Sequence, residues 1–154
     1  MEINGLPLHA LVVHAAVVFG PLSALAGVLY AAVPRWRGRL RWPLVAAVTV
    51  ALVSIWVAYF SGESVEENNT YGGPLAALLE THEERANVLR LTTTGFALLT
   101  YVSVWWQGRP ARGSSHTVGT VLAVLVGLAA VATGVYTVLT GDAGAQIAWY
   151  GTNG

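Results

Sequence analysis

The stretch TVGTVLAVLVGLAAVATGVYTVLT, which runs from Thr117 to Thr140, decides the fold because it contains no Asp, Glu, Lys or Arg. A helix needs about 20 consecutive apolar residues to cross the hydrocarbon core of a bilayer, and this stretch is long enough. Three further stretches without a charged residue lie between Glu2 and Arg35, between Arg41 and Glu63, and between Arg90 and Arg109. The sequence therefore predicts an integral membrane protein with four spans.

The composition points to the same class of protein. Of the 154 residues, 55% are hydrophobic and 10% are charged, and the mean hydropathy is +0.57. Soluble domains carry about 25% charged residues. These values exclude a soluble enzyme, a nucleic-acid-binding protein and a disordered chain, and the length indicates one domain over residues 1–154. Cysteine is absent, which excludes a thiol nucleophile, a Cys-bound metal and a c-type haem.

We expect an all-α, up-down four-helix bundle, because two of the three connections are short and place consecutive helices side by side in opposite directions. Pro7 and Pro43 suit the first turns of the first two helices, where an amide hydrogen has no partner in any case. The acidic segment 61–82 is expected outside the bundle, with one or two helical turns at 74–80. The predicted helices cover approximately residues 7–33, 43–60, 83–106 and 117–140.

The charged residues are segregated along the chain. The short connections carry the arginines Arg35, Arg37, Arg39, Arg41, Arg109 and Arg112. All the acidic residues fall at the opposite ends of the spans: Glu2, Glu63, Glu66, Glu67, Glu80, Glu83, Glu84 and Asp142. The positive-inside rule then predicts a multi-pass protein of the plasma (inner) membrane with both termini outside. Only Arg85 and Arg90 are basic residues on the outer side, so they call for a structural or functional reason.

Small residues form a stripe on the last predicted helix. They are Gly119, Ala123, Gly127, Ala130 and Gly134, which fall within an arc of about 80° at 100° per residue. Such a stripe favours close packing of another helix, and a flat cofactor against the smooth face is the alternative. A further set of residues near the span ends is typical of interfacial anchors: Trp36, Trp42, Trp105, Trp106 and Trp149.

Three of the four histidines converge on the outer side of the membrane. His9 and His14 belong to the outer half of the first span, and His82 belongs to the outer start of the third. An ionisable residue at the depth of His14 is costly, which makes it a candidate functional residue. The five-residue spacing turns His9 and His14 about 140° apart, so we expect them to serve different partners. We interpret His116, at the inner end, as a solvated residue.

These residues suggest two cofactor sites. In the first, His14 and His82 are the axial ligands of a b-type haem, and Arg85 and Arg90 pair with its propionates. In the second, imidazoles and carboxylates together bind Zn, Fe or Mn. The candidate ligands of that metal site are His9, His14, Glu63, Glu66, Glu67, His82 and Glu83. Without a cofactor, Arg90 would pair with Asp142 or Glu83, and the histidines would be packing residues.

Several motifs are similar to those of a known family. They are Gly5-Leu6-Pro7-Leu8-His9, Val12-Val13-His14, Gly62-Glu63, His82-Glu83, Gly141-Asp142-Ala143-Gly144 and Trp149-Tyr150-Gly151. With them the chain resembles, over nearly its whole length, the bacterial four-span membrane proteins known only as a transmembrane domain of unknown function. Some of those relatives carry a Rieske iron-sulfur or cytochrome c domain on the same chain. The resemblance therefore implies a place near respiratory electron transfer.

The sequence thus predicts a membrane redox accessory or electron-transfer subunit that holds a haem b near the outer face. Two alternatives are a non-haem metal-binding membrane protein, which could be an enzyme, and a cofactor-free structural or assembly subunit. No catalytic residue is assigned. The expected partners are membrane lipid and either further copies of the chain or a larger membrane complex, and no nucleic acid.

Overall fold

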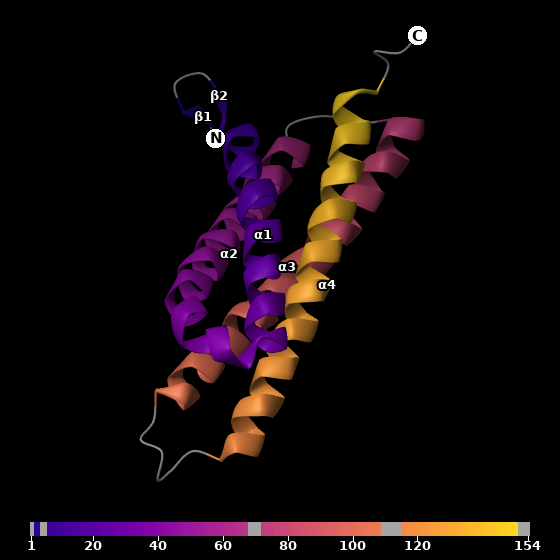
Figure 1. Ribbon diagram of the computed structural model, residues 1–154. Helices are drawn as coiled ribbons and strands as arrows, with labels where there is room; N and C mark the ends of the chain where they lie inside the picture. The colour runs from indigo at the N-terminus through magenta and orange to yellow at the C-terminus, as the bar shows by residue number, and fades with distance from the viewer. Residues whose placement is uncertain (1, 4–5, 68–71, 109–114, 151–154) are drawn as a thin grey trace.

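Four long helices, running alternately up and down, make up the computed structural model (Figure 1). They are α1 (Leu8–Ala32), α2 (Arg37–Glu67), α3 (Pro74–Gln107) and α4 (His116–Ala148). Two short strands, β1 (Glu2–Ile3) and β2 (Leu6–Pro7), pair antiparallel before α1, and a 3-10 turn, η1 (Pro34–Trp36), joins α1 to α2. The structure describes residues 2–3, 6–67, 72–108 and 115–150, without the side chains of 2–3, 6–7 and 65–67. The predicted all-α bundle is confirmed.

Three of the helices extend beyond their predicted limits. Helix α2 begins at Arg37 and α3 at Pro74, so the segment 74–80 continues the third span instead of forming separate turns. Pro43 lies inside α2, and Pro7 belongs to β2, so the first-turn prediction was wrong for both prolines. The reason is that charged residues mark the edge of the hydrocarbon, whereas Arg and Glu are good helix formers in water. A helix therefore continues where the apolar stretch ends.

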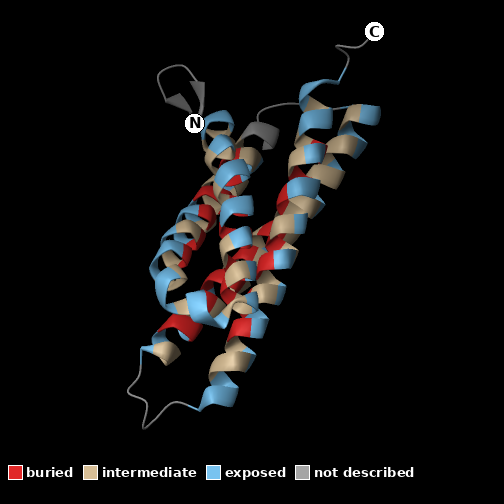
Figure 2. Ribbon diagram, viewed as in Figure 1, coloured by how far each residue is buried: buried red, intermediate tan, exposed pale blue. Residues whose placement is uncertain are grey.

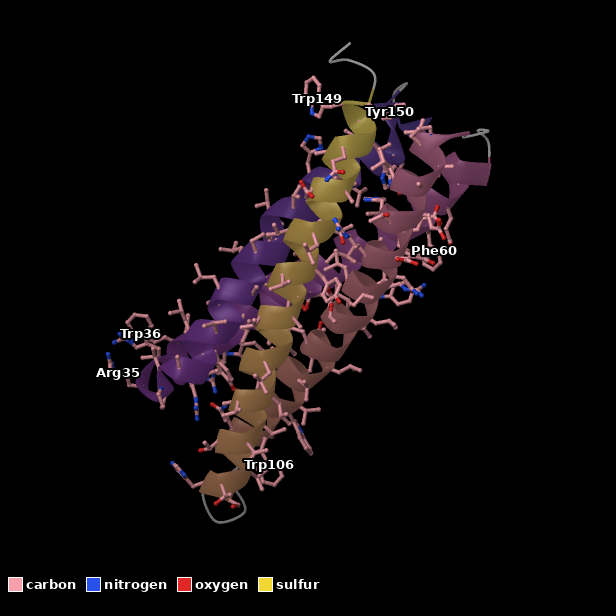
Figure 3. All side chains as sticks on the ribbon, turned by 90° about the vertical axis from the view of Figure 1, so that its right-hand side faces the viewer. Arg35, Trp36, Phe60, Trp106, Trp149 and Tyr150 are labelled. Carbon is pink, nitrogen blue, oxygen red and sulfur yellow. The ribbon has the colours of Figure 1, made fainter. Side chains whose placement is uncertain are left out.

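All four helices are long and apolar enough to cross a membrane. At 1.5 Å per residue the 33 residues of α4 measure about 50 Å, which exceeds the roughly 30 Å of hydrocarbon. Large aromatic residues occupy both ends of the bundle (Figure 3). Trp36, Trp42 and Trp105 are exposed at one end, and Trp149 and Tyr150 are exposed at the other. This arrangement agrees with the predicted interfacial anchors.

The small-residue stripe of α4 packs against α1. A Cβ atom added to Gly127 would lie 2.7 Å from the Cβ of Ala31, and one added to Gly134 would lie 3.1 Å from the Cβ of Ala24. On the facing helix, a Cβ at Gly27 would lie 2.7 Å from the Cβ of Ala130. Helix α1 therefore covers the stripe, which supports the close-packing interpretation. Figure 2 shows the buried residues on the inward faces of the helices, and apolar side chains cover much of the outside.

At the end that carries the arginines, hydrogen bonds between polar side chains join α1 to α3. The Tyr30 side chain is fully buried, and its hydroxyl lies 2.9 Å from the Ser103 hydroxyl oxygen. The amide of Gln107 donates to the Tyr30 hydroxyl. In a membrane, the side of a helix that faces lipid and the side that faces the bundle are both apolar, so hydrogen bonds between side chains help to hold the helices together.

Candidate functional site

His9 connects α1 to α2 at the end that carries the acidic residues. Its Nδ1 lies 2.9 Å from the Ala58 carbonyl oxygen and 3.2 Å from the Ser61 hydroxyl oxygen. Because a carbonyl can only accept, Nδ1 carries the proton and donates it. The ring lies against Gly62, where an added Cβ would be 3.2 Å from the imidazole Cε1. Glycine at this position therefore makes room for the ring.

His82 connects α3 to α4 in the same way. Its Nδ1 lies 3.1 Å from the Thr140 carbonyl oxygen, and its Cε1 would lie 3.1 Å from a Cβ added to Gly144. In each helical hairpin, then, an imidazole donates to a backbone carbonyl, and a glycine four residues after that carbonyl accommodates the ring. The α1–α2 and α3–α4 hairpins repeat one local arrangement.

This arrangement fixes the tautomer of both rings. With the proton of the neutral imidazole on Nδ1, the lone pair is on Nε2, which is the usual state of a metal-ligating histidine. The structure therefore anchors two imidazoles of the same tautomer, one in each hairpin.

The site lies near one edge of the membrane. Twenty residues of helix, or about 30 Å, separate Trp42 from Gly62 on α2, and the same number separates Trp105 from Arg85 on α3. That length equals the hydrocarbon thickness. With the tryptophans at one edge, we expect His9 and His82 at the other, at the end of the bundle to which the acidic residues belong by sequence.

Arg85 lies one turn after His82 and binds the same part of α4. Its Nη1 donates to the Leu139 carbonyl oxygen at 2.9 Å, one residue before the carbonyl that accepts from His82. The same nitrogen lies 3.8 Å from a carboxylate oxygen of Asp142. The sequence suggested Arg90 as a partner of Asp142, whereas the structure gives that place to Arg85. One of the two unexpected outer arginines is thus explained by the α3–α4 interface.

Arg90 is held by aromatic rings between α2 and α3. Its guanidinium carbon lies 4.1 Å from the centre of the Tyr59 ring and 4.9 Å from that of Trp56. Its Nη2 also donates to the Asn87 side-chain oxygen at 2.6 Å. These contacts give Arg90 a structural role that the sequence pattern did not indicate.

We expect the Arg90 and Tyr59 side chains to stabilise the fold cooperatively. In a double-mutant cycle of Arg90→Met and Tyr59→Leu, the coupling free energy should be about 0.5–1 kcal/mol, because the guanidinium lies over the face of the ring while both side chains remain partly exposed. The matched control is the cycle of Arg41→Met and Trp42→Leu, in which the guanidinium carbon lies 5.6 Å from the ring centre and Trp42 is exposed. Its coupling free energy should be smaller. Denaturant unfolding in mild detergent measures both cycles. Additive effects at Arg90 and Tyr59 would contradict the prediction.

The remaining histidines lie away from this arrangement. His14 is exposed, and its Nδ1 donates to the Ala10 carbonyl of its own helix at 2.6 Å. Among the described residues it has no hydrogen bond to another helix that could orient it toward His82. His116 is exposed at the start of α4, as expected of a solvated residue. His9 thus bonds to α2, whereas the hydrogen bond of His14 stays within α1.

Two of the candidate carboxylate ligands are described and do not form a metal site with the imidazoles. Glu63 and Glu83 are exposed, and the side chains of Glu66 and Glu67 lie outside the described residues. Within the described part of the chain, no group of three or more His, Asp or Glu side chains is placed to hold a metal ion. The residues that sequence reasoning missed are Gly62 and Gly144. Both belong to quoted motifs, but only the contacts show that they accommodate the rings.

Together the helices and the site define a four-helix membrane protein with a pair of anchored imidazoles at one membrane edge. The family model described as "Predicted membrane protein (DUF2231)" matches residues 5–153. The chain belongs to this family of membrane proteins, as the resemblance indicated. No curated protein and no solved structure matches the chain.

Proposed function

We propose that the protein is a redox accessory or electron-transfer subunit that binds one b-type haem through His9 and His82. The observation that carries this proposal is the pair of imidazoles, each anchored through Nδ1 with the Nε2 lone pair left for a ligand bond. The pair replaces the combination of His14 and His82 expected from the sequence. A bound haem would supply one-electron exchange at its iron.

The ligand set fits a haem better than a non-haem metal. A haem iron takes two axial ligands from the protein, whereas Zn, Fe or Mn without a porphyrin needs three or more side chains. His9 belongs to the α1–α2 hairpin and His82 to the α3–α4 hairpin (Figure 1). Two imidazoles on separate hairpins are suited to approach a flat group from opposite sides.

The side chains near the imidazoles have distinct roles in this proposal. Arg85, one turn from His82, is the candidate partner for a propionate, because its side chain is only partly covered. Arg90 loses that role, since its guanidinium contacts Tyr59 and Trp56. Ser61 and the carbonyls of Ala58 and Thr140 keep the rings in one orientation.

Purification from cells supplied with a haem precursor tests the proposal. We expect a Soret band, a reduced-minus-oxidised spectrum of a low-spin b-type haem, and about one haem per chain in a pyridine haemochrome assay. A protein that remains colourless after reconstitution with haemin would overturn it. Elemental analysis of the same sample would show whether a non-haem metal takes its place.

The contacts also favour a second candidate, a cofactor-free structural or assembly subunit. Each imidazole already joins two helices, which is a sufficient reason for its presence in a membrane bundle. The exposed imidazole of His14 on α1 suits contact with another protein in the membrane, because an ionisable group facing lipid is costly. In both candidates the protein acts as part of a larger assembly.

We propose that the site faces the outside of the cell, and the absence of cysteine gives a direct test. Gly38 and Gly72 lie at opposite ends of the bundle, and a Cβ at either glycine meets no atom within 4 Å. A membrane-impermeant maleimide should label Gly72→Cys in intact cells, and Gly38→Cys only after permeabilisation. The arginines near Gly38 are the physical reason. The reverse labelling pattern would invert the topology.

A further inference from the structure

The end of the bundle opposite His9 and His82 carries positive charge that no described carboxylate balances. Arg35 lies in η1, and Arg37, Arg39 and Arg41 lie in the first turns of α2. Every acidic residue of the chain belongs by sequence to the other end of the bundle, and no described carboxylate lies near these arginines. Figure 3 shows Arg35 beside Trp36 at this end, far from Trp149 and Tyr150.

The amino end of α2 adds locally to this positive charge, whereas the last carbonyls of α1 accept hydrogen bonds from Arg37. The amino end of a helix carries a partial positive charge of about half an elementary unit, which favours anions and disfavours cations. Helix α2 begins at Arg37 and has no acidic residue in its first turn. The repulsion among these groups would be relieved by an anion from outside the chain.

Two of the arginines are positioned to bind such an anion. Arg37 donates from Nε to the Tyr30 carbonyl at 3.1 Å and from Nη2 to the Ala31 carbonyl at 3.3 Å, which fixes its guanidinium at the end of α1. Arg41 follows one turn later, so the two side chains share a face of α2. The guanidinium carbon of Arg41 lies 5.6 Å from the centre of the exposed Trp42 ring, at the surface of the bundle.

The position relative to the membrane identifies the anion. Trp36 and Trp42, which are 40% and 63% exposed, flank the arginines and mark the level of the lipid headgroups. At that level the abundant anion is the phosphodiester of an acidic phospholipid, and guanidinium groups match its oxygens in pairs. We propose that Arg37 and Arg41 bind the headgroup of an anionic phospholipid, and that Arg35 and Arg39 strengthen the attraction.

Native mass spectrometry of the purified protein in a neutral detergent tests this proposal. The probes are phosphatidylglycerol and phosphatidylcholine with identical acyl chains. We expect phosphatidylglycerol to bind at least tenfold more tightly, since each arginine at the surface contributes about 1 kcal/mol. The Arg37→Gln/Arg41→Gln double variant should lose most of this preference, and Arg35 and Arg39 should retain a small part of it. Equal binding of the two lipids by the natural chain, or an unchanged preference in the variant, would overturn the proposal.

Two controls separate a specific lipid site from a general effect of charge and from a disturbed helix end. Arg85→Gln removes one positive charge at the other end of the bundle and should leave the lipid preference unchanged. Because Arg37 also contacts the end of α1, the single variant Arg41→Gln tests the site without those contacts and should lower the preference several-fold. If inorganic phosphate displaces the lipid at millimolar concentration, the site binds a soluble anion and the lipid proposal is wrong.

Discussion

Replacing His82 or His9 with alanine will abolish the low-spin bis-histidine spectrum of the haem-loaded protein. Each variant removes one of the two proposed axial ligands, and iron with a single imidazole becomes high-spin or loses the haem. His14→Ala and His116→Ala are matched controls, since both remove an exposed imidazole from the same chain, and both should leave the spectrum unchanged. Absorption and electron paramagnetic resonance spectra measure the effect.

Two further variants distinguish ligation from packing. His82→Gly leaves space beside Gly144, and added imidazole should restore the low-spin spectrum, which a purely structural role would not produce. Arg85→Gln should retain the haem and shift its reduction potential, because propionate pairing is secondary to iron ligation. Loss of the spectrum in His14→Ala, with His9→Ala unaffected, would instead return the ligand role to His14.

The second large effect is expected at the contact between α1 and α4. A methyl group at Gly27 would lie 2.7 Å from the Ala130 Cβ and 2.8 Å from the Phe96 ring, closer than two such atoms can approach. Gly27→Ala should therefore lower the free energy of unfolding by about 1–3 kcal/mol. Gly127→Ala, which meets the Ala31 Cβ at 2.7 Å, should do the same.

Gly95 offers the control for this prediction, because a Cβ added there meets no atom within 4 Å. Gly95→Ala should be neutral or slightly stabilising, since alanine favours the helix by up to about 1 kcal/mol. Denaturant unfolding in mild detergent, followed by loss of tertiary structure, measures all three variants. Equal stability of Gly27→Ala and Gly95→Ala would show that the two helices do not pack as described.

The fold could be predicted from the sequence because few backbone structures are stable across a bilayer. Backbone polar groups in hydrocarbon must be paired within the segment, so an apolar stretch such as Thr117–Thr140 has to be helical. The stripe around Gly127 was also correctly interpreted as a surface for close helix packing. Helix ends were predicted less well, because the charge at Arg37 or Glu63 limits the apolar stretch and does not end the helix.

The candidate site could be predicted from the sequence only in part. His9, His82 and Arg85 were identified as candidates, but the pairing of His14 with His82 rested on depth alone. Lipid and the bundle core are both apolar, so the hydrophobic pattern does not reveal which face of α1 is turned inward. The face that a helix turns toward the bundle is determined instead by packing, which for α1 includes the contact of Gly27 with Ala130.

The sequence by itself determined the class of protein, the four spans and the separation of acidic from basic ends, because these follow from the cost of placing charge in hydrocarbon. Only the tertiary structure decided which imidazoles are anchored and how. The bonds from His9 to Ala58 and from His82 to Thr140 join residues 49 and 58 positions apart, and no local pattern encodes them. Close packing decides which side chains meet across helices. Gly62 and Gly144 each leave room for an imidazole ring, and a larger residue at either position would require the ring to shift.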